Sequence, residues 1–467
     1  MGKGIGRRAG ILLAMSALPG SDGSGALGAE ANAFVDFLAD AGQGFWQILP
    51  IGPVGKSHSP YQSHSAFAGN PAFIDKGLLS KDPDRYAPQG ARYERFIREN
   101  EAWLDDYALF EAVRASEGGK PLALWPDELR NPDRKTLLSL RERYRTRTEE
   151  VKHEQFCFFS QWREFKLYAN LKGVDIIGDL PFYLCEDSAE FWLRRGCFDV
   201  DGNGRPAASA GVPPDLFTKN GQIWNNPVYN WGKHKKAIFS LWHERLEQAE
   251  RLYDGVRIDH FRALADYYAI PIEYTPSGER VPAASKGEWR LAPGRPFVDM
   301  IRKEYPSLFI IVEDLGELSE NAKALVAESG FPGMKVLQFA FTDDPNNPYL
   351  PHNIPKNAVV YTGTHDNDTL VGWMTSSPRR ERRYAMDYLG HSTPQDLPAA
   401  MLAAVLASQA DTAIIPLQDW LGLGSEARVN KPGVVNRRNW TWRCPKNALS
   451  HNLSARIKRT VKGLYNR

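Results

Sequence analysis

The sequence repeats one pattern, a short and nearly continuous apolar run that ends in a polar or acidic residue. Each run is rich in β-branched or aromatic residues, which is typical of a strand buried on both faces of a parallel sheet. Helical patterns separate the runs, at 31–41, 233–253, 318–329 and 395–409. The runs themselves occupy 46–51, 174–179, 255–259, 308–314, 336–341, 359–362 and 413–417.

This alternation of strands and helices implies right-handed crossovers and an α/β fold. With an eighth strand expected near 66–74, the pattern predicts a (β/α)8 TIM barrel. The 467 residues are interpreted as a single domain, because such barrels reach this size when their loops carry insertions. Two insertions are expected, a helical one at about 80–165 and a loop-rich, cleft-lining one at about 185–232. After Asp419 only 467 − 419 = 48 residues remain, too few for a C-terminal β-domain.

Acidic residues collect where the predicted strands end. Loops at the carboxyl end of a barrel place side chains from several strands around one point, so an active site is expected there. The competing interpretation is that each acid only caps the helix that follows it. The acids in question are Asp179, Asp259, Glu313, Asp366 and Asp419.

Composition excludes several classes of function. The formal net charge is +2 with Lys and Arg spread along the chain, so no nucleic-acid partner is expected. No apolar stretch approaches the roughly 18–20 residues of a membrane span. The four cysteines fall in no metal-binding spacing, which predicts free thiols, no metal site and a reducing cytoplasm. The apolar run at 11–15 follows basic residues and superficially resembles a signal peptide.

Arg257 and Asp259 are two residues apart on a predicted strand and therefore share a face. The guanidinium is expected to lower the pKa of Asp259 and keep it ionised, as a covalent nucleophile at an anomeric carbon must be. A structural ion pair at the barrel rim is the alternative.

Glu313 follows an apolar run, and Gly316 allows the backbone to turn after it. Partial burial near another acid raises the pKa of a carboxyl group, which suits a general acid. The alternative is that Glu313, or Asp314 in its place, caps the following helix.

His365 and Asp366 lie in a polar cluster after another strand. They could bond adjacent sugar hydroxyls as positive charge develops at the anomeric carbon. A metal site competes with this interpretation, but no second cluster of His and carboxylates lies nearby in the sequence.

Together these segments resemble the 4-α-glucanotransferases called amylomaltases or disproportionating enzymes, relatives of the α-amylases. The resemblance runs almost end to end, and it places Gly10 to Gly20 inside the domain and not in a signal. Its further motifs are 10–13 (GILL), 16–20 (SALPG), 45–50 (FWQILP), 59–63 (SPYQS), 65–71 (SAFAGNP), 178–183 (GDLPFY), 211–215 (GVPPD), 221–224 (GQIW), 226–227 (NP), 331–334 (FPGM) and 439–443 (NWTWR).

The resemblance implies a retaining double displacement without a cofactor. Asp259 would be the nucleophile, Glu313 the acid/base and Asp366 the transition-state stabiliser. The donor would be an α-1,4-glucan, and the acceptor an α-1,4-glucan or glucose. The residues implied in substrate binding are Arg257 beside the nucleophile, Asp179, His365 and Tyr61 at the donor sugar, Trp224 and Gln222 beside the cleft, and Ser59 near the acceptor path.

The sequence departs from the family at several loop positions, which puts subsite shape and acceptor choice in doubt. A mainly hydrolytic retaining α-glucanase and a non-catalytic glucan-binding relative therefore remain as alternatives. Asn225 and Ala263 stand where Gly is usual, and Leu216 stands where an aromatic is usual. Val434 and Arg438 replace Thr and Gly, and Ser24 and Ala26 lie in a turn usually richer in Gly, Ile and Asp.

Overall fold

The computed structural model describes residues 7–19, 27–214, 221–275, 278–282, 284–391, 393–434 and 436–467. Eight parallel strands close into a barrel, as predicted, in the order β1-β13-β12-β11-β10-β6-β3-β2. The strands are β1 (Arg8–Leu12), β2 (Phe45–Gln47), β3 (Asp175–Leu180), β6 (Gly255–Ile258), β10 (Phe309–Val312), β11 (Gly333–Val336), β12 (Ala358–Tyr361) and β13 (Thr412–Pro416).

Two strand predictions are wrong. The eighth strand is not near 66–74, where the chain forms a 3-10 turn, η2 (Pro71–Phe73). It is β1, which pairs with β2 and β13 and contains the start of the apolar run that resembled a signal peptide. The run at 336–341 is also displaced, because β11 ends at Val336 and 337–339 form a 3-10 turn. Both misassigned segments contain buried apolar residues, such as Phe67, Phe73 and Leu337, and burial alone does not distinguish a strand from a turn.

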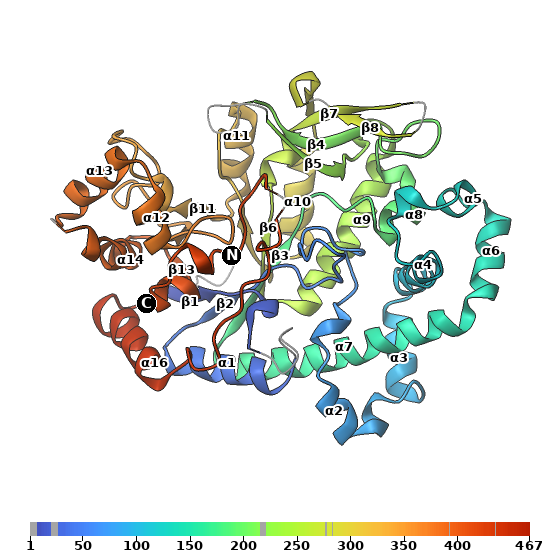
Figure 1. Ribbon diagram of the computed structural model, residues 1–467, viewed down its shortest axis with the longest axis horizontal. Helices are drawn as coiled ribbons and strands as arrows, with labels where there is room; N and C mark the ends of the chain where they lie inside the picture. Colours follow the sequence, from blue (N-terminus) through green and yellow to red (C-terminus); the bar gives the residue numbers. More distant parts are fainter. Residues whose placement is uncertain are drawn as a thin grey trace.

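Helices cover the outside of the barrel (Figure 1). The four predicted helices are present as α1 (Ala29–Asp40), α9 (Trp231–Leu252), α11 (Glu320–Ser329) and α14 (Leu397–Ala407). Further helices near the C-terminal half are α10 (Gly294–Glu304), α12 (Leu370–Ser376), α13 (Arg379–Leu389), α15 (Leu417–Leu421) and α16 (His451–Lys458). None of the helices in the described ranges combines the length and apolarity needed to cross a membrane.

The segment between β2 and β3 is helical, and its long last helix runs along the bottom of Figure 1. The densely charged run from Arg134 to Lys152 lies in the last two helices of this segment and is mostly exposed, as a solvated helix face should be. The helices are α2 (Lys76–Lys81), α3 (Ala91–Glu99), α4 (Leu104–Ser116), α5 (Asp127–Arg130), α6 (Arg134–Arg143) and α7 (Arg145–Leu171).

A small antiparallel sheet, which the sequence did not predict, lies at the top of Figure 1. Part of it comes from 185–232, whose Gly, Pro and Asn content had indicated loop. That stretch contains the helix α8 (Ala189–Leu193) and two of the strands. The strands are β4 (Ala208–Val212), β5 (Gln222–Pro227), β7 (Asp266–Tyr274), β8 (Arg280–Pro282) and β9 (Glu288–Leu291).

The barrel interior has its own apolar core, separate from the layer between strands and helices. Its buried side chains come from strands all round the barrel and include Phe45, Ile177, Ile311, Met334 and Tyr361. Side chains alternate along a strand, so the residues two positions beyond these point to the same axis. The interior packing therefore directs the polar residues at the strand ends into one place.

Candidate active site

Asp259 and Glu313 follow neighbouring strands at the same register. Ile258 pairs with Val312 across β6 and β10, and the next residue on each strand is one of the two acids. The Glu313 amide donates to the Ile258 carbonyl at 3.0 Å, and the Phe261 amide donates to the Glu313 carbonyl at 3.2 Å. Neighbouring strands stand about 4.8 Å apart, so the ladder brings the two carboxyl groups together.

Arg257 lies at the top of the barrel interior and bridges two carboxylates. Its partner in the β3–β6 register is Asp179, and its Nη1 donates to both Asp179 carboxylate oxygens at 2.9 Å. Its Nη2 lies 2.7 Å from Asp259 Oδ1, while its Nε faces the Met334 sulfur at 3.3 Å. The Asp179 side chain is fully buried, whereas 28% of the Asp259 side chain is exposed. Asp259 therefore presents an oxygen to a ligand while its guanidinium partner stays inside.

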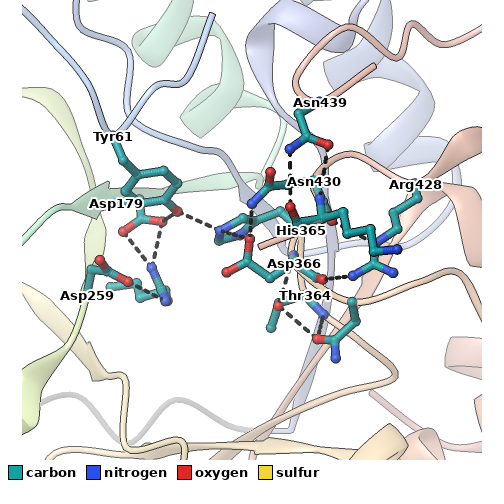
Figure 2. Close-up of polar contacts among 12 residues, drawn as sticks. Tyr61, Asp179, Asp259, Thr364, His365, Asp366, Arg428, Asn430 and Asn439 are labelled. Atoms are coloured by element: carbon teal, nitrogen blue, oxygen red, sulfur yellow. Dashed lines mark hydrogen bonds and ion pairs between the residues drawn. The ribbon is translucent and has the colours of Figure 1, made fainter. Parts of the chain in front are cut away.

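A chain of contacts continues from Asp179 to the opposite side of the site (Figure 2). The Tyr61 hydroxyl donates to Asp179 Oδ2 at 2.8 Å and lies 3.0 Å from His365 Nε2. The Tyr61 and His365 rings stack with centroids 5.2 Å apart. The His365 Nε2 is also 3.5 Å from Asp366 Oδ1. The structure thus brings together all three proposed catalytic carboxylates, Arg257 and the three residues expected around a donor sugar.

Asp366 is more exposed than Asp259, with 45% of its side chain accessible against 28%. Asn430 donates to its Oδ1 at 2.6 Å, and Arg428 donates to its backbone carbonyl at 2.6 Å. Both come from the irregular segment after the last barrel strand, and neither was predicted as a site residue. Trp440 from the same segment packs beside Tyr61 and His365, with ring centroids 5.8 Å from each. The sequence could have indicated these residues, because this segment is a long polar and aromatic stretch without periodicity, which is typical of a functional loop.

Among the described residues, no cationic side chain forms a hydrogen bond with Glu313. Its Oε2 accepts from the His260 amide and its Oε1 from the Leu315 amide, both at 2.8 Å. His260 adopts a left-handed conformation with φ of 48°, which turns the chain sharply after Asp259. Burial, together with the Asp259 charge, raises the pKa of Glu313 to about 7 against the opposing effect of Arg257. Glu313 can therefore hold a proton near neutral pH, as predicted.

The predicted lowering of the Asp259 pKa is wrong. Burial raises the pKa of Asp259, and Arg257 opposes this shift without reversing it. The physical reason is that Arg257 also binds both oxygens of Asp179, so two carboxylates share one cation. Asp259 nevertheless keeps a direct charged partner, which no described residue gives Glu313, and this guanidinium favours the ionised form of Asp259.

The family model for 4-alpha-glucanotransferase matches residues 13–86 and 78–449. The 4-alpha-glucanotransferase of Thermus thermophilus is 40% identical over 97% of this chain and 97% of its own. That of Clostridium butyricum is 36% identical over 96% and 98% of the two chains. This chain belongs to the 4-alpha-glucanotransferase family. The structure of an amylomaltase from Streptococcus agalactiae in complex with acarbose superposes with a TM-score of 0.90, at 35% identity over 99% of both chains.

An aromatic and polar wall borders the site on the side of the antiparallel sheet. Trp224 on β5 packs edge-on against the His260 ring with centroids 4.7 Å apart, and its indole N–H donates to Gln222 at 3.1 Å. Burial lowers the pKa of His260 to about 3, so this ring is neutral. Ser59 is half-buried two residues before Tyr61, and no contact joins it to a carboxylate within the described residues.

Two of the departures from the family fit their surroundings. Asn225 is exposed with φ of 60°, a left-handed conformation that Asn adopts more readily than other non-Gly residues. Ala263 is fully buried in the 3-10 turn η6 (Phe261–Leu264). Val434 and Arg438 lie exposed in the loop before Trp440, and nothing in the structure explains these two substitutions. Leu216, Ser24 and Ala26 lie outside the described residues.

The alternative that strand-end acids cap helices fails for Glu313 and Asp314. The N-cap of α11 is Ser319, whose hydroxyl accepts from the Ala322 amide. Asp314 instead accepts from the Met334 amide at 2.7 Å and pairs with Lys335 at 2.9 Å. Gly316 has φ of 82°, the turn expected there. Across the described ranges, no group of three or more His, Cys, Asp or Glu side chains is arranged to hold a metal ion.

Proposed function

We propose that this protein is a 4-α-glucanotransferase that moves α-1,4-glucan segments from a donor to the 4-hydroxyl of an acceptor by retaining double displacement. The observation that carries the proposal is the Asp259–Glu313 pair. The two acids lie side by side on register-matched strands, and within the described part of the chain Asp259 alone of the two has a guanidinium partner. A close pair of carboxyl groups in unequal environments, about 5–5.5 Å apart, is what a retaining mechanism requires.

In the first step, protonated Glu313 donates its proton to the glycosidic oxygen as the bond to the anomeric carbon breaks. An Asp259 oxygen forms the new bond to that carbon, giving a glucosyl-enzyme. In the second step, the Glu313 carboxylate takes the proton of the acceptor 4-hydroxyl. The acceptor oxygen then attacks the anomeric carbon and Asp259 leaves as a carboxylate. Two inversions leave an α-1,4 bond, and no cofactor takes part.

The residues across the site hold the donor sugar in this scheme. Asp366 stabilises the positive charge that develops on the sugar ring, by accepting hydrogen bonds from adjacent hydroxyls that strengthen in the transition state. His365, Tyr61 and Asp179 line the same subsite, and Arg257 fixes the Asp259 carboxylate. The support for these roles is the connected set of contacts from Asp259 to Asn430.

On the acceptor side, Trp224 offers a half-buried aromatic face and Gln222 an amide, with Ser59 near the path. Transfer needs the acceptor to compete with water at about 55 M, through positioning or shielding of the intermediate. The partners are α-1,4-glucans as donor and acceptor, with glucose as the smallest acceptor. The proposed location is the cytoplasm, supported by four buried cysteines that are all free.

Incubation with maltotriose, followed by chromatography of the products, tests the proposal. A ladder of longer and shorter glucans together with glucose is expected. Small sugars without any elongated product would instead indicate a hydrolytic α-glucanase. Unchanged maltotriose, with binding still measurable by calorimetry, would indicate a non-catalytic glucan-binding protein. The retained trio of carboxylates favours transfer or hydrolysis over binding alone.

A further inference from the structure

Residues 363–369, which form most of the connection between β12 and α12, carry both His365 and Asp366. Its first part is braced internally, because Asn367 Oδ1 accepts from the Thr364 amide and hydroxyl at 2.9 Å each. Near its end, Gln338 donates to the Asp368 carbonyl at 2.7 Å. Arg428 and Asn430 hold the Asp366 backbone and side chain from the C-terminal segment. These contacts shape the loop but leave open what fixes its two ends.

Asp419 joins the two ends. One carboxylate oxygen, Oδ2, accepts from the Thr362 hydroxyl at 2.6 Å, directly before the loop. The other, Oδ1, accepts from the Leu370 amide at 2.8 Å, directly after it. Asp419 lies in α15, immediately beyond β13. Thr362 and Leu370 are buried, and Asp419 is nearly so. A single carboxylate therefore closes the loop at its base and ties it to the neighbouring strand.

We propose that Asp419 is a positioning residue that sets the placement of Asp366 and His365 against the donor sugar, by clamping both ends of the 363–369 loop. This inference rests on the proposed function. It assigns a role to a strand-end acid that touches neither substrate nor the other site carboxylates in the chemistry described above. A carboxylate suits the role because its two oxygens accept two hydrogen bonds from different directions.

The stability of the fold does not by itself account for an acid at this position. Burial raises the pKa of Asp419 to about 6, with the nearby Asp368 adding to the rise. No cation pairs with Asp419 among the described residues. At neutral pH the group is thus a buried charge without a cationic partner, which disfavours folding. Retention of such a charge at the base of a site loop fits a functional constraint.

Substitutions at Thr362 test the clamp with the least disturbance. Thr362→Val keeps the side-chain shape but removes the hydroxyl that Asp419 accepts, whereas Thr362→Ser keeps the hydroxyl. Thr362→Val is expected to lower kcat for maltotriose disproportionation by about ten- to a hundredfold, since small displacements of catalytic groups cost that much. KM is expected to change much less, because Asp366 acts mainly in the transition state. Thr362→Ser is expected to restore most of kcat.

Asp419→Ala tests the same clamp from the other side. It removes both acceptor oxygens, whereas Asp419→Asn can still accept from the Leu370 amide through Oδ1 and donate from Nδ2 to the Thr362 hydroxyl. We expect Asp419→Ala to lose at least as much kcat as Thr362→Val, and Asp419→Asn to lose much less. Thr362→Val combined with Asp419→Ala should be no more impaired than Asp419→Ala alone, since both changes remove the same hydrogen bond. The exposed control is Asp396→Ala, which removes the acceptor of the Thr393 hydroxyl and should leave kcat unchanged.

The inference is overturned if Thr362→Val keeps kcat within about twofold of wild type, or if Thr362→Ser is as impaired as Thr362→Val. If Asp419→Ala does not fold, the comparison of the two Thr362 variants still decides. Failure of the proposed function would show differently, as a wild-type protein that does not elongate maltotriose.

Discussion

Asp259 and Glu313 occupy equivalent positions on neighbouring strands, yet their surroundings differ in kind. Asp259 has a guanidinium nitrogen 2.7 Å away and remains partly exposed. Glu313 accepts from two backbone amides, those of His260 and Leu315, and no described cation contacts it. Burial raises the pKa of both, to about 7 for Glu313, while Arg257 opposes the rise at Asp259 through a direct contact. The difference teaches that a charged partner, and not depth in the barrel, decides which acid is ionised and which holds the proton.

The largest expected effect comes from removing the ionised member of the pair. Asp259→Asn deletes the nucleophile, so transfer and hydrolysis should both fall by on the order of 10⁵-fold or more. Initial rates with maltotriose, measured beside a thermal unfolding curve to confirm folding, provide the test. Near-normal activity in a folded variant would show that Asp259 does not form the covalent bond.

Removing the protonated member, Glu313, should lower activity less, and only with donors whose leaving group needs a proton. Glu313→Gln is expected to lower kcat on maltotriose by about 10²- to 10⁴-fold, the usual contribution of a general acid. A maltosyl fluoride donor needs no protonation of its leaving group, so formation of the glucosyl-enzyme from it should be largely preserved. Stopped-flow fluoride release distinguishes the two steps. An equal loss of rate with both donors would show that Glu313 does not act as the general acid.

The pH profile sharpens the same comparison. The first step needs Glu313 protonated, so kcat/KM should decline as pH rises through about 7, the pKa of Glu313, by roughly tenfold per unit beyond it. The Asp259 charge helps to raise this pKa, so Asp259→Asn should lower it. Carbon-13 NMR titration of the Glu313 carboxyl in wild type and variant measures the shift. An unchanged or higher Glu313 pKa in the variant would contradict the coupling.

The smallest effect is expected away from the acids, at Asn225. Its left-handed φ of 60° is accessible to Gly, and the side chain is exposed, so Asn225→Gly should change the free energy of unfolding by less than about 1 kcal/mol. We expect the relative rates with glucose and maltose as acceptors to change more than the first step does. The ratio of the two transfer rates, set against fluoride release, measures this. An unchanged acceptor ratio would remove Asn225 from the site.

The sequence predicted the barrel because its buried strands are short, nearly continuous apolar runs, and it placed Asp259 and Glu313 at the ends of two of them, while their proposed roles came from the family resemblance. It missed the first strand, Arg8–Leu12, because basic residues followed by an apolar run are also typical of signal peptides. It did not predict the contacts of Asn430 and Arg428, because tertiary folding alone brings that irregular segment to Asp366. The sign of the Asp259 shift was wrong for a similar reason. The Arg257–Asp259 spacing was visible in the sequence. The contact of Asp179 with the same guanidinium was not, because it depends on the pairing register of β3 and β6.

Trapping the covalent intermediate tests the account most directly. The protein is incubated with a slow donor such as 5-fluoro-α-glucosyl fluoride, digested with pepsin and analysed by tandem mass spectrometry. The account predicts one peptide that is heavier by the glycosyl group, with the modification on Asp259. A label on Glu313 or Asp366, or turnover of the donor with inversion at the anomeric carbon, would contradict it.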